Sequence, residues 1–118
     1  EVLDENGLLG ELQARAGLIR EWETFLERFP ILICPISGEL PFFQQQDVAS
    51  EAAFQAIMET QLTQRAIPVL GLPGLAVSTG LAGDIPVGVQ LIAGRYREDI
   101  LIAAGASSWL CRLLSSLI

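Results

Sequence analysis

The stretch from Gly71 to Glu98, GLPGLAVSTGLAGDIPVGVQLIAGRYRE, carries the most regular pattern of the chain. Residues 75–79 and 87–93 are rich in apolar and β-branched side chains and lie between glycines and a proline, which is typical of strands. The six residues between them, 80–85, are too few for a crossover helix, so antiparallel pairing is predicted. Alternation along the second strand places Val87, Val89, Leu91 and Ala93 on one face and Gln90 and Ile92 on the other.

The first half of the chain predicts one helix, one strand and a loop. Apolar residues recur every three to four positions from Gly7 to Phe29, which is the pattern of an amphipathic helix, and Pro30 stops it. The continuously apolar run Ile31 to Ile36 predicts a short strand that is buried on both faces. Residues 37–46 contain glycine, proline and three successive glutamines, so a loop is expected there.

Two more helices are expected in the second half. Ser50 followed by Glu51 predicts a capped helix start, and this helix is expected to end before Pro68. Glu98 and Asp99 predict the start of a last helix, in which the acids act as a cap. The expected core-facing stripe of that helix comprises Ile100, Ala104, Ser107, Cys111, Leu114 and Ile118.

The resulting order of elements predicts an α/β fold in one domain over residues 1–118, with about three strands and three helices. No internal repeat or interdomain linker is visible. A three-stranded sheet leaves two edges, so at least one edge is expected to lack a partner in this chain.

The hydrophobic content and the net charge limit the kinds of partner that the chain can bind. Hydrophobic residues make up 51% of the 118 residues, and the mean hydropathy is +0.46, which is high for a small domain. We interpret the excess as surface that meets another copy of the chain or a missing part of the same protein. A net charge of −7 argues against nucleic acid, and no apolar run approaches the length of a bilayer span. The first five residues lack the pattern of a signal peptide, so a cytoplasmic location is expected.

The residue types limit the chemistry. All seven basic residues are arginine and there is no histidine, so neither a Ser-His nor a Ser-Lys pair can form within this sequence. No catalytic residue is therefore predicted, and Ser37 and Ser78 are interpreted as ordinary strand-end hydroxyls. No metal is predicted because the only two cysteines, Cys34 and Cys111, lie far apart and are expected to be buried thiols. No cofactor is predicted, since the glycines form no phosphate-binding motif.

The block from Gly71 to Glu98 resembles the C-terminal part of the amidase signature family. Members read close to G-L-P-A-(I)-S-V-P-x-G, then a short loop, L-P-V-G-V-Q-L-I-G, an aromatic residue and a glutamate. Pro86 to Ile92 matches this pattern without a break. The resemblance implies a large mixed sheet flanked by helices, whose other strands come from an upstream part. It also implies that the nucleophilic Ser, the bridging Ser and the catalytic Lys of the family lie upstream of this chain.

The same resemblance implies a role in the substrate pocket of a carboxamide hydrolase. In the family, the strand that matches Leu32 to Pro35 and its following loop help to wall the acyl pocket. Ile36, Ser37 and Phe42 are the matching candidates for contacting a small-molecule amide. Gln61 occupies the position at which the tRNA amidotransferase type carries an acid for the glutamine amino group. Gln61 is therefore a fourth candidate, and it favours a simple amide over glutamine as substrate.

Two departures from the family pattern are visible. Pro68 stands where the family usually has Asn, and Ser78 stands where it usually has Pro, so a different local backbone is expected. The alternative function is a stand-alone interaction or structural module, which could associate as a homo-oligomer. A reading frame that continues upstream through a Gly/Ser-rich segment would favour the enzyme segment, and a Met just before Glu1 would favour the module.

Overall fold

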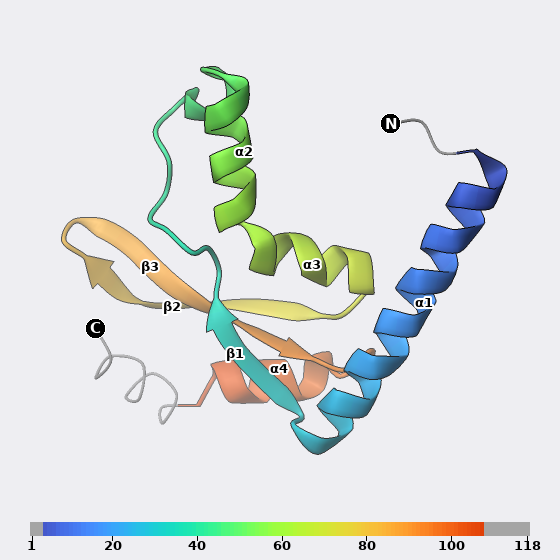
Figure 1. Ribbon diagram of the computed structural model, residues 1–118. Coiled ribbons are helices and arrows are strands. Elements are labelled where there is room, and N and C mark those ends of the chain that lie inside the picture. The colour runs from blue at the N-terminus through green and yellow to red at the C-terminus, as the bar shows by residue number, and fades with distance from the viewer. Residues whose placement is uncertain (1–3, 108–118) are drawn as a thin grey trace.

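Figure 1 shows the computed structural model of the chain, which describes residues 4–107. Its elements follow the predicted α/β order, with one helix more than expected. They are α1 (Glu5–Arg28), β1 (Ile31–Pro35), the 3₁₀ helix η1 (Gln46–Val48), α2 (Glu51–Thr60), α3 (Leu62–Leu70), β2 (Gly74–Ala82), β3 (Ile85–Ala93) and α4 (Glu98–Gly105).

The three strands form one sheet in the order β1-β3-β2, and β3 pairs antiparallel with both neighbours. This confirms the predicted antiparallel pair. Both strands extend further than predicted into segment 80–85, so that only Gly83 and Asp84 connect them. Gly83 adopts φ +64°, the left-handed conformation that tight hairpin turns require and that glycine reaches without steric cost.

Side chains of β3 enter two separate cores. Leu91 and Ala93 pack with Leu101 of α4 on one face of the sheet, and Val89 joins them. Ile92 packs on the opposite face with residues of α1 and α3. The predicted split of the β3 side chains is confirmed for these residues, and the sheet lies between α4 and the pair α1 and α3.

The helix starts follow the sequence signals in the first half of the chain. The carboxylate of Asp4 accepts a hydrogen bond from the Gly7 amide at 2.7 Å, and the predicted cap at Ser50 accepts one from the Ala53 amide at 3.1 Å. α1 buries Ile19 and Leu26 against α3, while Leu18, Phe25 and Phe29 remain exposed.

The prediction of one helix ending before Pro68 is wrong in two respects. The chain forms two helices that meet at Gln61, and Pro68 lies inside the second. The carbonyl of Thr60, at the junction, accepts a hydrogen bond from the Gly38 amide at 2.7 Å, a tertiary contact that competes with a continuous helix. Pro68 removes one backbone donor from α3, which ends soon afterwards at Gly71 with φ +67°.

The prediction that β1 is buried on both faces is also wrong. Ile33 is 42% exposed, although its β3 partner Leu91 is fully buried. Within the described residues β1 is an edge strand, and α4 is the one helix on the face that Ile33 shares. The single helix α4 buries side chains of the central strand β3 more completely than those of the edge strand β1.

α4 begins at Glu98 as predicted, but its most buried residue was missed. Leu101 is only 2% exposed and anchors α4 on the sheet, whereas Ile100 and Ala104 pack at the border of that core. The predicted stripe residues Cys111, Leu114 and Ile118 lie outside the described residues.

The molecule is open and flat. Its radius of gyration is 17.0 Å and its dimensions are 50 × 41 × 17 Å, whereas a compact domain of this length has a radius of about 13 to 14 Å. Figure 1 shows α2 and the first half of α1 projecting from the sheet. Within residues 4–107, no helix combines the length and apolar character needed to cross a bilayer.

The hairpin offers a matched test of the core. Leu91 is fully buried between the strands and α4, while Leu81 in β2 is 59% exposed. We expect Leu91→Ala to lower the free energy of unfolding by about 2 to 5 kcal/mol, since it removes buried methyl groups and leaves a cavity. Leu81→Ala should change it by less than about 0.5 kcal/mol. Urea titration of both variants measures this, and equal effects would contradict the assignment of the core.

Candidate functional site

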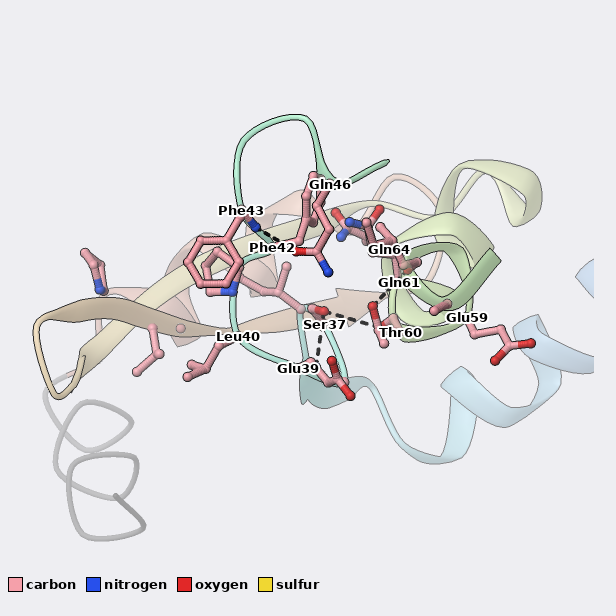
Figure 2. A pocket seen from close by; sticks show the side chains of 18 residues that line it. Ser37, Glu39, Leu40, Phe42, Phe43, Gln46, Glu59, Thr60, Gln61 and Gln64 are labelled. Carbon is pink, nitrogen blue, oxygen red and sulfur yellow. Dashed lines mark hydrogen bonds between the residues drawn. The ribbon is translucent and has the colours of Figure 1, made fainter. Parts of the chain in front are cut away.

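A cavity of about 1100 Å³ lies between the loop that follows β1, the junction of α2 with α3, and the start of β3. Figure 2 views this cavity from close by. The four residues predicted from the sequence to contact a substrate, Ile36, Ser37, Phe42 and Gln61, all lie on its wall. The structure therefore brings together residues that are up to 25 positions apart in the sequence, while their role toward a ligand stays a prediction.

Hydrogen bonds attach the first part of the loop to the junction of the two helices. The Gly38 amide and the Ser37 hydroxyl both donate to the Thr60 carbonyl, at 2.7 and 3.3 Å. The Thr63 hydroxyl of α3 donates to the Ile36 carbonyl at 2.8 Å. These bonds hold the floor of the cavity in place by linking segments that are distant in sequence.

The far side of the loop is apolar and exposed. Phe43 is 84% exposed, and Leu40 and Phe42 are also exposed, although all three line the cavity. Gln46 orders this end of the loop, because its side-chain oxygen accepts a hydrogen bond from the Phe43 amide at 2.9 Å. The cavity thus has an aromatic rim that a ligand could cover.

Three glutamine side chains supply the neutral polar groups of the wall. Figure 2 shows the rings of Phe42 and Phe43 on one side of the view, Gln61 and Gln64 on the other, and Gln46 between them. Sequence reasoning found Gln61 but missed Gln46 and Gln64. The run of glutamines at 44–46 was the available signal for Gln46, and the helical spacing of 61 and 64 was the signal for Gln64.

The wall contains no assembled nucleophile. Ser37 donates to the Thr60 carbonyl and accepts a bond from the Glu39 amide at 3.3 Å, so its hydroxyl serves the loop. No nitrogen base is available to it in a sequence without His or Lys. Across residues 4–107, no group of three His, Cys, Asp or Glu side chains is placed to hold a metal ion.

β3 contributes Pro86, Val87 and Gly88 to the wall, and sequence reasoning missed this role. A Cβ atom on Gly88 would lie 2.6 Å from the Val77 carbonyl oxygen of β2, closer than any side chain tolerates. Gly88 therefore allows β2 and β3 to approach at the point where β3 borders the cavity. The position of this glycine in the PVGVQ segment was the signal available in the sequence.

Oε1 of Gln90 is buried and accepts no hydrogen bond from the described residues. The side chain lies close to Gly74, where a Cβ atom would be 2.8 Å from Nε2. Its strand partners Ala76 and Cys34 bring no side-chain donor that reaches Oε1. A buried acceptor without a donor costs about 1 to 3 kcal/mol, which marks this position as incomplete in the described chain.

Two groups with shifted pKa values, Asp99 and Cys34, lie outside the cavity wall. A hydrogen bond from Arg97 at 3.1 Å lowers the pKa of the exposed Asp99 carboxyl. The predicted cap at the start of α4 is corrected in one respect, since Arg97 occupies the cap position and makes no side-chain capping bond, while Glu98 and Asp99 lie in the first turn. Partial burial raises the pKa of the Cys34 thiol, which makes it a weaker nucleophile at neutral pH.

Gly88 and Gly94 form a matched pair for testing the wall. Both have ordinary backbone angles, but a Cβ atom on Gly94 would meet nothing within 4 Å. We expect Gly88→Ala to force the two strands apart, to lower the midpoint of urea unfolding and to shift the NMR signals of residues 36–38. Gly94→Ala should leave both nearly unchanged. Equal behaviour of the two variants would contradict the close approach of β2 and β3.

Comparisons with known proteins identify relatives of this segment. The chain is 38% identical over 107 residues to an indoleacetamide hydrolase of Bradyrhizobium japonicum, and 36% identical to one of Bradyrhizobium diazoefficiens. It is 29% identical over 97 residues to a glutamyl-tRNA(Gln) amidotransferase subunit of Desulforudis audaxviator. These matches cover 82 to 90% of this chain, but only 19 to 23% of the relatives.

No family model and no solved structure matches the chain. The relatives nevertheless agree with the resemblance carried by the PVGVQLI block, since both kinds are amidase signature enzymes. The α/β elements of the described residues are consistent with that assignment. The chain is an amidase signature segment, homologous to about a fifth of the length of those enzymes.

Proposed function

We propose that the chain is the C-terminal segment of an amidase and forms part of its substrate pocket. The enzyme would hydrolyse a carboxamide to a carboxylate and ammonia. Its Ser-Ser-Lys centre would lie in an upstream part of the protein, and this segment would not be catalytic alone. The names of the relatives support amide chemistry, and the absence of Lys and His from the sequence supports the division of roles.

The observation that carries the proposal is the cavity beside the loop that follows β1. Ile36, Ser37, Phe42 and Gln61 were selected by a family resemblance, and they line one cavity. An amide group carries both N–H donors and a carbonyl acceptor, and the glutamine side chains of the wall offer partners for both. The cavity volume of about 1100 Å³ is at the upper end of the range for small-molecule sites.

The aromatic rim favours an amide that carries an aromatic group. Phe42 and Phe43 offer ring faces and edges against which a planar group can pack. The two most similar relatives named above are indoleacetamide hydrolases, and indole is such a group. Gln61, which stands in place of an acid, supports this class over free glutamine.

Phe42 and Phe54 provide a matched test of ligand binding. Their side chains are 43% and 42% exposed, but only Phe42 lines the cavity. We expect titration with phenylacetamide to shift the NMR signals of the Gln46, Gln61 and Gln64 side-chain amides. Phe42→Ala should weaken binding about five-fold, which corresponds to roughly 1 kcal/mol for one aromatic contact. Phe54→Ala should not change it.

The same samples test the division of roles. The chain alone should release no ammonia from phenylacetamide, because it has no base to activate a serine. Binding without turnover is the expected result. Turnover that disappears in Ser37→Ala or Ser78→Ala would overturn the proposal, and so would shifts confined to residues outside the cavity.

The alternative function, a stand-alone interaction module, rests on a different observation. Leu18 and Phe25 of α1 and its C-cap residue Phe29 form an exposed stripe, in which the rings of Phe25 and Phe29 are tilted by 38° with centroids 5.1 Å apart. Exposed aromatic stripes are typical of interfaces. A second copy of the chain or the upstream part of an amidase would cover it.

Association of the isolated chain can be measured by sedimentation velocity. We expect dimers or larger species at micromolar concentration, and a shift toward monomer in the double variant Phe25→Gln and Phe29→Gln. Ile102→Gln on α4, which replaces a residue that is 63% exposed, is the control and should leave association unchanged. A monomer at all concentrations would argue against both self-association and the module.

A further inference from the structure

The charged residues of the cavity wall all have the same sign. Among the described residues that line the cavity, Glu39 and Glu59 carry a formal charge, and no arginine is present. Both side chains are exposed, and neither forms an ion pair with another described residue. Figure 2 shows Glu39 below Ser37, and Glu59 next to Thr60 with its carboxylate directed outward from the helix.

The arginines closest in sequence do not line the cavity. Arg65 of α3 donates a hydrogen bond to the Met58 carbonyl, and Arg28 lies over the ring of Phe29 on α1. Helix ends do not supply a compensating positive field. The C-terminus of α2 and the N-terminus of α3 meet at Gln61, so their partial charges oppose each other at the cavity.

The proposed reaction changes the charge of the ligand. Water attacks the amide carbon, the C–N bond breaks, and a C–O bond forms. A neutral amide and one water thereby become a carboxylate and an ammonium ion. The product that keeps the aromatic group therefore carries a negative charge that the substrate lacked.

We propose that Glu39 and Glu59 determine charge selectivity at this cavity, so that it prefers a neutral amide and repels the carboxylate formed from it. This inference rests on the proposed function and adds a means of product release to it. The carboxylates of these two residues repel a negatively charged ligand at the rim of the cavity. A single exposed carboxylate changes the affinity for a like charge by about two-fold through a water-like dielectric, and two of them by about four-fold.

Three ligands with the same ring separate charge from shape. We would titrate the chain with phenylacetamide, phenylacetate and the cation 2-phenylethylamine, and follow the NMR signals of Gly38, Gly88 and the Gln61 side chain. The amide should bind at least about four-fold more tightly than the acetate at low salt. Raising sodium chloride to about 0.5 M should reduce this ratio, because the charges are exposed and screened.

Substitution of Glu39 and Glu59 tests whether these two residues cause the charge selectivity. In the double variant Glu39→Gln and Glu59→Gln, phenylacetate should bind more tightly by about four-fold. The cation should bind more weakly, and the affinity for the neutral amide should change less than that for either ion. Opposite changes for the two ions cannot arise from a general distortion of the loop. Glu11→Gln on α1 lowers the net negative charge away from the cavity wall, and it should leave all three affinities nearly unchanged.

The outcomes distinguish this inference from the proposed function. If none of the ligands shifts signals of the cavity, the proposed function fails, and this inference fails with it. If the amide binds there but the acetate binds equally well, only the charge selectivity is overturned. A preference for the amide that persists in the double variant would also overturn the role of Glu39 and Glu59.

Discussion

The fold depends on β3, because this strand is hydrogen-bonded on both sides and filled on both faces. It pairs with β2 along most of its length and with β1 over residues 89–93, and its alternating side chains enter two cores at once. A shift of register by one residue would exchange Leu91 with Ile92 and leave neither core filled. The same strand begins at the cavity wall, so the geometry of the candidate site is attached to the most constrained element of the molecule.

The cavity exists because the segment from 51 to 70 is broken into two helices. Had α2 continued straight into α3, the Thr60 carbonyl would not be open to the loop that follows β1. Instead, Ser37 and Gly38 are bonded to that carbonyl, and Thr63 is bonded to Ile36. The break therefore places the glutamine side chains opposite the aromatic residues of the loop. The candidate site is linked to the fold here by three hydrogen bonds to backbone carbonyls rather than by a packed core.

The exposed surface and the unsatisfied interior are both unusual for an isolated domain. The molecule is more extended than a compact domain of its length, its α1 carries an exposed aromatic stripe, and Gln90 lacks a donor for its buried oxygen. The open shape and the exposed stripe are costly for an isolated domain and become favourable once another surface covers them. The relatives, of which this chain matches about a fifth, are large enough to supply such a surface. These features support the proposal that the chain is a segment of an amidase. The proposed charge selectivity of Glu39 and Glu59 is a separate property of the cavity rim.

The sequence by itself determined the hairpin, the two faces of β3, the start of α2, and the relation to amidases. These follow from local patterns, namely alternation at period two, capping by Ser50, and the unbroken PVGVQLI match. The tertiary structure alone decided where the helix before Pro68 breaks, how exposed Ile33 becomes, and that the oxygen of Gln90 finds no donor. Each of these depends on contacts between residues distant in sequence, such as Gly38 with Thr60, which no local pattern records. The four predicted site residues share one wall for the same reason, since the folding of the loop onto the helix junction brought Gln61 beside Ser37.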